Sequence, residues 1–219
     1  MNIGIFGTGN VGITIANKLL RLGHHVMLGS RSSQNEKGLN WAKSAGANAS
    51  FGTYAEAAAF GEVLFHCTLG FGAVDAIKSA GAANLHGKIL VDITNPLDFS
   101  KGMPPTLFVT NDDSLGEQIQ RAVPEVHVVK ALNTVNAELM VNPALIPGNH
   151  TVFICGNDEN AKTKVTEILS GWFGWKSVID LGDITNSRAV EGILPIWIRL
   201  MIKLGTPFFN FQINVQAAN

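Results

Sequence analysis

The sequence predicts an α/β protein with a doubly wound parallel sheet and a small C-terminal α/β extension. Short apolar runs alternate with amphipathic runs along the 219 residues, which is typical of strands joined by helices that cover both faces of a sheet. A glycine-rich turn separates the first apolar run from the first amphipathic run. No internal repeat or linker divides the chain, so we expect residues 1–219 to form a single domain, with 151–219 as its extension.

The first half of the chain shows this alternation most regularly. In the first amphipathic run, Val11, Ile15 and Leu19 recur at helical spacing, and Gly23 is placed to end the helix. Strands are expected at 2–6, 25–28, 49–51, 62–67 and 88–93, with helices at 10–22, 36–45, 54–60 and 73–80.

The second half is less regular. Residues 94–112 contain several Pro and Gly and show no period, so we expect a loop over the functional site. Further strands are expected at 127–130, 151–155 and 177–181, and helices at 114–122 and 159–172. The elements beyond residue 150 are expected to extend the same sheet or to form a small cap.

The apolar stretch 185–204 is expected to form a long helix, which Pro195 should kink. We predict that one face of this helix packs against a second subunit, which would make the protein a homodimer. Burial of the same face within its own chain is the alternative. The face consists of Trp197, Leu200, Met201 and Leu204.

Composition excludes several classes of partner. With 46% hydrophobic residues, 15% charged residues and a formal net charge of −1, the chain lacks the clustered Lys and Arg that nucleic-acid binding needs. The apolar stretch 193–211 is interrupted by Arg199, Lys203 and Pro207, so we expect no membrane span. No signal-peptide pattern precedes the first strand, and we expect a cytoplasmic protein. The two cysteines have no metal-ligand spacing, and we expect no metal site.

The glycine-rich turn matches the G-x-G-x-x-G pattern of dinucleotide-binding folds. It follows a predicted strand and opens a predicted helix, which is the context that makes the pattern specific. Gly7 permits the tight turn, Gly9 lets the backbone approach a pyrophosphate, and Gly12 lets the helix pack closely on the strand. The start of the helix then offers free N–H groups to the phosphates. The sequence therefore predicts a Rossmann-like fold whose first contacts come from Gly7, Thr8, Gly9, Asn10, Val11 and Gly12.

The end of the second strand favours NADP over NAD. NAD-binding folds usually place Asp or Glu there to hold the ribose 2′-hydroxyl, but this chain has Ser30, Arg31 and Ser32. The Arg31 guanidinium can pair with a 2′-phosphate, and both serine hydroxyls can donate to it. Lys37 is placed to add charge.

Ligands of an open parallel sheet lie at the carboxyl ends of its strands. Thr68 and Leu69 follow one strand and are predicted to pack against the pyrophosphate and ribose. The residues that follow the next two strands are expected to border the nicotinamide, although a simple turn or cap is an equally good interpretation of the two asparagines. They are Asn95, Pro96, Ala131 and Asn133.

No residue stands out as a catalytic acid or base. The single tyrosine, Tyr54, has Ala58 four residues later, which excludes the Tyr–Lys pair of short-chain dehydrogenases. His66 ends an apolar strand and is interpreted as a buried, hydrogen-bonded side chain. We therefore assign no catalytic residue. Hydride transfer between two redox cofactors needs few protein acids or bases, because it depends mainly on the alignment of two rings.

Six segments carry a resemblance to known proteins: 7–12, 29–31, 91–96, 129–133, 153–158 and 188–195. They resemble those of the NADPH-dependent coenzyme F420 reductases (F420-dependent NADP oxidoreductases). They are equally similar to the cytoplasmic oxidoreductase domain of six-transmembrane metalloreductases. The resemblance extends over nearly the whole chain, in order. It implies a Rossmann-like domain with a C-terminal extension, usually dimeric, that moves hydride between NADP and a flavin or deazaflavin.

The second redox partner stays open between F420, FMN and FAD. The deazaflavin enzymes often have a His where Asn133 stands, and Asn133 is closer to the metalloreductase version. Two other functions fit the same motifs. One is an NADPH-dependent reductase of a small imine or carbonyl compound, and the other is a non-catalytic NADP-binding redox sensor.

Overall fold

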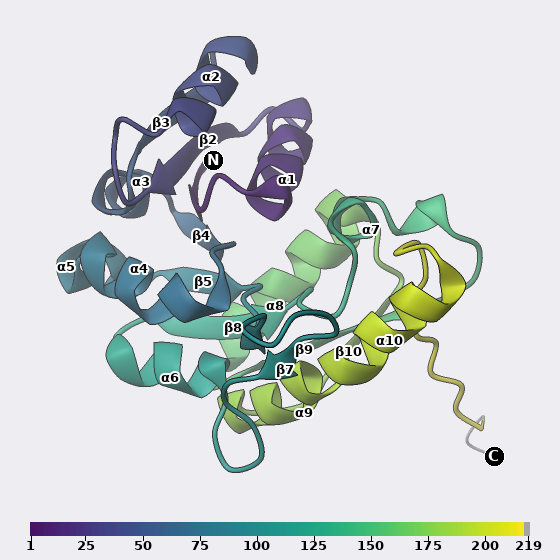
Figure 1. The fold of residues 1–219 in the computed structure, drawn as a ribbon. Coiled ribbons are helices and arrows are strands. Elements are labelled where there is room, and N and C mark those ends of the chain that lie inside the picture. The colour runs from purple at the N-terminus through teal and green to yellow at the C-terminus, as the bar shows by residue number, and fades with distance from the viewer. Residues whose placement is uncertain (217–219) are drawn as a thin grey trace.

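A computed structural model describes residues 1–216 of the protein. An eight-stranded sheet lies at its centre (Figure 1). The strand order is β10-β9-β8-β5-β4-β1-β2-β3. All neighbouring strands run parallel except β8 and β9, which are antiparallel. The strands are β1 (Asn2–Phe6), β2 (His25–Ser30), β3 (Ala49–Thr53), β4 (Val63–His66), β5 (Ile89–Asp92), β8 (His127–Ala131), β9 (Thr151–Gly156) and β10 (Ser177–Asp180).

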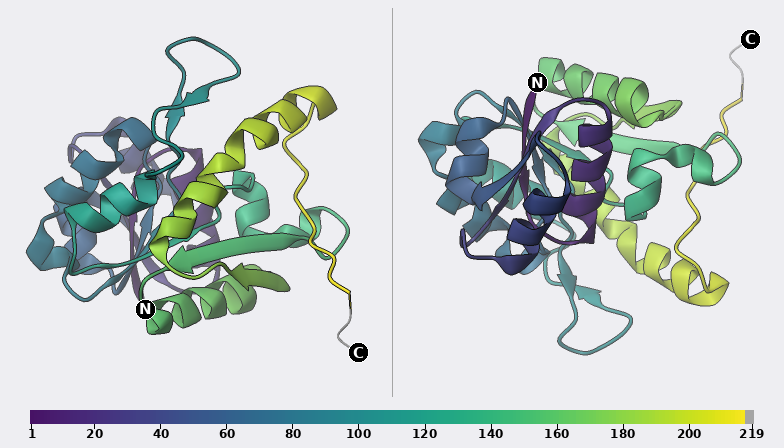
Figure 2. Two further views of the ribbon diagram at one scale, coloured as in Figure 1. Left: turned by 90° about the horizontal axis from the view of Figure 1, so that it is seen from below. Right: turned by 90° about the horizontal axis from the view of Figure 1, so that it is seen from above.

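Helices cover both faces of the sheet, as the alternating pattern predicted (Figures 1 and 2). One core contains apolar side chains of the helices α1, α2, α7 and α8, and the other contains those of α3, α4, α5 and α6. Within β4, Val63 and Phe65 enter the first core and Leu64 enters the second, because successive side chains of a strand point to opposite faces. The helices are α1 (Asn10–Arg21), α2 (Glu36–Ser44), α3 (Tyr54–Phe60), α4 (Ala73–Ala80), α5 (Ala82–Leu85), α6 (Leu115–Ala122), α7 (Ala137–Val141), α8 (Glu159–Glu167), α9 (Ser187–Gly192) and α10 (Leu194–Leu204).

The strand order reverses between β1 and β4, which places a crevice at their carboxyl ends. From β1 the chain proceeds outward through β2 to β3, and from β4 it proceeds the other way through β5 to β8. Ligands of open α/β sheets bind at such a reversal. The predicted Rossmann-like, doubly wound fold is confirmed. The C-terminal strands β9 and β10 join the same sheet, which makes it mixed rather than wholly parallel.

Three local predictions were wrong or incomplete. The predicted loop 94–112 contains a short antiparallel pair, β6 (Leu97–Asp98) and β7 (Thr106–Leu107). The short helices α5 and α7 were missed because four and five residues are too few to show a helical period. The helix predicted at 159–172 continues from α8 as a π-helical segment, Ile168–Phe173.

The stretch 185–204 contains two helices, α9 and α10, in place of the single kinked helix that was predicted, and they meet at Ile193. Pro195 lies in the first turn of α10, where its missing N–H leaves no helical bond unmade. Trp197 is partly buried and stacks on Phe209 of its own chain, with ring centroids 5.2 Å apart. Ile196, Ile202 and Leu204 are exposed, and a dimer through this helix stays a prediction. Within the described residues, no helix is both long and apolar enough to cross a bilayer.

Candidate functional site

A cleft of about 780 Å³ opens at the reversal of strand order. Its wall combines the turn after β1 with the ends of β2 and β4 and with the loop after β5. Nine of the fifteen residues predicted to bind the cofactor line it: Gly7, Thr8, Gly9, Asn10, Val11, Arg31, Thr68, Leu69 and Asn95.

The turn after β1 has the stereochemistry that a pyrophosphate cradle needs. Gly7 has a φ of +116°, and a Cβ there would lie 2.7 Å from the Cys67 carbonyl oxygen. A Cβ at Gly12 would collide with the Gly7 carbonyl, so Gly12 supports helix packing and does not line the cleft. Gly9 has no atom within 4 Å of a Cβ position and faces open space. No side chain caps the first amides of α1, which therefore stay free for phosphate oxygens.

The open space at Gly9 gives a prediction for Gly9→Ala. Gly9 has an extended backbone, φ −77° and ψ 178°, that alanine adopts without strain, so the free energy of unfolding should stay nearly unchanged. The new methyl group enters the open space where a pyrophosphate is predicted, and it should weaken NADPH binding by about five- to thirtyfold, equivalent to about 1–2 kcal/mol of overpacking. Calorimetric titration and urea unfolding measure the two effects. Equal affinity in both proteins would mean that no ligand backbone lies against Gly9.

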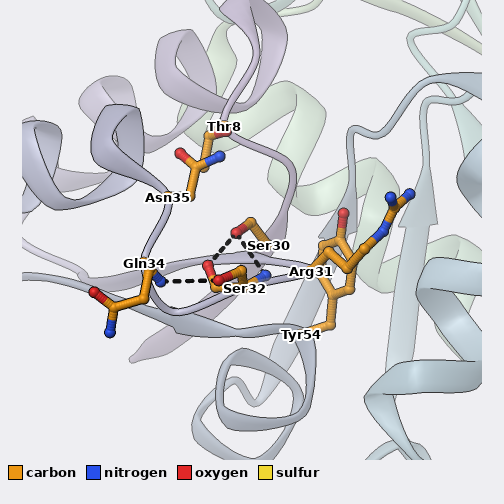
Figure 3. Close-up of a pocket in the computed structure, with 7 residues that line it drawn as sticks. All are labelled: Thr8, Ser30, Arg31, Ser32, Gln34, Asn35 and Tyr54. Atoms are coloured by element: carbon orange, nitrogen blue, oxygen red, sulfur yellow. Dashed lines mark hydrogen bonds between the residues drawn. The ribbon is translucent and has the colours of Figure 1, made fainter.

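A smaller pocket of about 360 Å³ adjoins the cleft at the end of β2 (Figure 3). The turn that forms it is preorganised: the Ser30 hydroxyl donates to the Ser32 carbonyl at 2.7 Å, and the Gln34 N–H donates to the Ser32 hydroxyl at 3.1 Å. The Ser32 hydroxyl hydrogen stays available to a ligand. In Figure 3 the Arg31 guanidinium points away from the two serines, and this exposed side chain must rotate to meet a phosphate beside them. The pocket is lined by Thr8, Ser30, Arg31, Ser32, Gln34, Asn35 and Tyr54.

The sequence did not predict several of the residues that line the cleft and the smaller pocket. Tyr54 lines both pockets, because α3 begins directly after β3 and turns back beside β2. Burial raises the pKa of the Tyr54 hydroxyl, although the charge of Arg31 opposes this shift. The tyrosine is therefore a neutral hydrogen-bonding group in this pocket. Its position directly after a predicted strand is the sequence signal that points to this pocket. Other missed residues of the cleft are Phe71, Asp75, Ser79, Leu97 and Phe99.

Three of the residues expected around the nicotinamide do not line the cleft: Pro96, Ala131 and Asn133. Ala131 is buried in the sheet. The Asn133 side chain turns inward, where its Nδ2 donates to Asn95 Oδ1 at 3.1 Å and to the Val190 carbonyl at 3.1 Å. Asn95 Nδ2 in turn donates to the Asn133 carbonyl at 2.9 Å. Asn133 therefore holds Asn95 against the cleft from behind.

Four buried ionisable side chains lie behind this wall, and we call His66, Asp92, Lys130 and Glu191 the buried charge cluster. The register pairs His66 with Asp92 and Asp92 with Lys130 across three neighbouring strands, so the three side chains share one face. Lys130 Nζ lies 2.9 Å from Asp92 Oδ2 and 2.8 Å from Glu191 Oε1. Each of these residues is at most 2% exposed.

Burial and the interactions within the cluster set the protonation states of His66, Asp92 and Lys130. Burial opposes ionisation of Asp92, but the charge of Lys130, a smaller electrostatic contribution from His66 and two hydrogen bonds outweigh it and lower the pKa of Asp92. Burial likewise opposes the charge on Lys130, but Asp92 and Glu191 outweigh it and raise the pKa of Lys130. Burial lowers the pKa of His66 to about 4, although Asp92 acts in the other direction. The neutral His66 confirms its interpretation as a buried histidine, with Nε2 3.0 Å from the Thr68 hydroxyl.

The lowered pKa of His66 makes stability depend on pH. The unfolded chain takes up a proton at this imidazole near pH 6.5, whereas the folded chain does so only near pH 4. Acid therefore favours the unfolded state, and the difference in this contribution between pH 7.5 and 5.0 is about 2 kcal/mol. Urea unfolding of the wild type and of His66→Gln at both pH values measures it. Between pH 7.5 and 5.0, we expect the free energy of unfolding of His66→Gln to fall by about 2 kcal/mol less than that of the wild type. An identical fall in both proteins would contradict the lowered pKa of His66.

Comparison with known proteins gives a consistent result. The model of the family described as NADP oxidoreductase, coenzyme F420-dependent, matches residues 2–96. The crystal structure of a putative F420-dependent NADP-reductase from Arthrobacter sp. FB24 is 48% identical and has a TM-score of 0.91, with 97% of this chain and 99% of that chain covered.

Two relatives of known name are similar over part of their length. Metalloreductase STEAP3 of Rattus norvegicus is 31% identical over 200 residues, which are 89% of this chain and 37% of that protein. The F420-dependent NADP reductase of Methanocaldococcus jannaschii is 36% identical over 120 residues, which are 54% of this chain and 53% of that protein. At the level of the family, the predicted class of NADP-dependent oxidoreductase is confirmed. The chain belongs to the family of coenzyme F420-dependent NADP oxidoreductases.

Proposed function

We propose that this protein transfers a hydride between NADP(H) and the ring of a flavin or deazaflavin, such as F420, FMN or FAD. The observation that carries the proposal is that the cleft has a polar end and an apolar end. The polar end joins the Arg31 pocket, which suits a 2′-phosphate. The apolar end lies beyond the ends of β4 and β5, where exposed apolar side chains line the wall. A dinucleotide and a second ring fit such a combination of polar and apolar ends.

The cofactor-binding residues of this proposal divide by their chemistry. The free amides at the start of α1 bind the pyrophosphate, and Arg31 with Ser30 and Ser32 binds the 2′-phosphate. Thr8 and Tyr54 complete this polar end. Asn95, held by Asn133, borders the nicotinamide as part of a rigid wall. When bound, NADPH supplies a hydride, and the acceptor takes one further proton from solvent to balance its two electrons.

The acceptor ring is expected against the apolar wall. Leu69, Phe71 and Phe99 are 83%, 66% and 51% exposed, and all three line the cleft. Phe71 is fixed by stacking on Phe108, with ring centroids 4.5 Å apart. Exposed apolar side chains that gather at one cleft are typical of a binding surface. The protein would then catalyse by excluding water and aligning two rings.

Anaerobic oxidation of NADPH, followed at 340 nm with F420, FMN and FAD as acceptors, tests the proposal. We expect turnover with at least one of them, and a higher KM for that acceptor in Phe99→Ser. Phe208→Ser is the matched control, because Phe208 is 41% exposed but lies beyond α10, outside the cleft. Binding of NADPH without turnover on any acceptor would favour a redox sensor. Turnover only with a small imine or carbonyl compound would overturn the proposal that the acceptor is a flavin or deazaflavin ring.

A further inference from the structure

The buried charge cluster lies directly behind the cleft, at the carboxyl ends of β4, β5 and β8. Thr68 lines the cleft, and its hydroxyl oxygen is 3.0 Å from Nε2 of His66. Asp92 accepts hydrogen bonds from the Thr94 N–H at 3.0 Å and from the Thr94 hydroxyl at 2.7 Å. Lys130 donates to the Thr94 carbonyl at 2.6 Å. The cluster therefore fixes the strand end that carries Asn95 into the wall.

The charges of this cluster do not cancel. Two carboxylates, Asp92 and Glu191, share the single ammonium group of Lys130. The N–H groups of Leu115 and Gly116 donate to Glu191 at 2.9 and 3.0 Å, but they contribute dipoles and no net charge. His66 is neutral near pH 7, since burial lowers its pKa to about 4. One negative charge is left over, and at this depth water screens it weakly.

We infer that the buried charge cluster biases the bound nicotinamide toward its oxidised form, so that the protein favours NADPH as the hydride donor. The nicotinamide ring is positive in NADP⁺ and neutral in NADPH. A fixed negative charge behind the cleft therefore stabilises the oxidised form selectively, by the same electrostatic preorganisation that enzymes direct at developing charge. The inference rests on one part of the proposed function, the binding of NADP in this cleft.

Glu191→Gln tests the inference, because it removes one charge with little change in shape. The dissociation constants of NADP⁺ and NADPH are measured by calorimetry for the wild type and the variant. We expect the ratio Kd(NADP⁺)/Kd(NADPH) to rise by about four- to fifteenfold, which is the effect of a unit charge if a separation of about 10 Å from the ring and an effective dielectric constant of about 20–40 are assumed. If Glu191 had a purely structural role, the substitution would weaken the binding of both nucleotides equally and leave the ratio unchanged.

Glu167→Gln is the matched control, because it is the same chemical change on α8, where the side chain is 61% exposed and pairs with Lys164. Its ratio should equal that of the wild type. An unchanged ratio in folded Glu191→Gln overturns the inference. If that variant does not fold, the wild type decides: tighter binding of NADPH than of NADP⁺ overturns the inference, and tighter binding of NADP⁺ supports it. Failure of the wild type to bind either nucleotide would instead overturn the proposed function.

Discussion

Lys130→Met is expected to lower the free energy of unfolding by about 3–5 kcal/mol, the cost of leaving buried carboxylates without their partner. Methionine has nearly the length of lysine, so the substitution creates little cavity and tests the charge. Lys130 is fully buried and lies within 2.9 Å of both Asp92 and Glu191. Both carboxylates are buried as well, with Asp92 0% and Glu191 2% exposed. Urea unfolding at pH 7.5 measures the difference.

Lys164→Met provides the comparison for this prediction. Lys164 also lies 2.9 Å from a carboxylate, Glu167, but the two side chains are 43% and 61% exposed. Exposed pairs contribute less than about 1 kcal/mol, so this variant should unfold almost like the wild type. If both variants lost the same small amount, the carboxylates of the buried charge cluster would have to be protonated or hydrated in the folded state. That result would also remove the excess negative charge inferred behind the cleft.

Arg31→Ala is expected to weaken NADPH binding by about ten- to a hundredfold and to leave NADH binding nearly unchanged. Losing one charge-assisted hydrogen bond to a phosphate costs about 1.5–3 kcal/mol, and NADH has no 2′-phosphate to lose it. Arg31 supplies the positive charge among the seven described residues of its pocket. Calorimetric titration of both nucleotides gives the selectivity directly.

The control for Arg31 is Lys37→Ala, which removes a positive charge from the start of α2, outside both pockets. We expect a change of less than about threefold for NADPH, because screening weakens exposed charges that do not touch the ligand. Equal losses of NADPH and NADH affinity in Arg31→Ala would mean that Arg31 supports the fold of the turn. If Lys37→Ala lost the selectivity for NADPH over NADH, the 2′-phosphate would instead bind near the start of α2.

Much of this protein could be predicted from short stretches of sequence. The strand and helix periods and the G-x-G-x-x-G turn depend on residues a few positions apart, so β1 through α4 were predicted nearly to their ends. The same is true of the Arg31 turn, whose serines bond within two residues of one another. A local rule predicted a kink at Pro195, and the boundary between α9 and α10 lies two residues before it, at Ile193.

The direction of side chains at the strand ends needed the folded sheet. Asn133 was expected to face the nicotinamide, but the left-handed backbone of Leu132, φ 61°, precedes it, and its side chain bonds Val190 instead. His66, Asp92 and Lys130 each look like one polar residue near the end of an apolar run. Only the register between β4, β5 and β8 brings them into one row.

The sequence by itself therefore determined the class of fold and the stereochemistry of the glycine-rich turn, and it predicted the preference for a 2′-phosphate, because stereochemistry and charge within a few residues decide them. The tertiary structure alone decided that Glu191 of α9 meets Lys130 of β8, and that Asn133 supports Asn95 from behind. The physical reason is that such pairings depend on strand order and helix docking between segments tens of residues apart, which local periodicity does not encode.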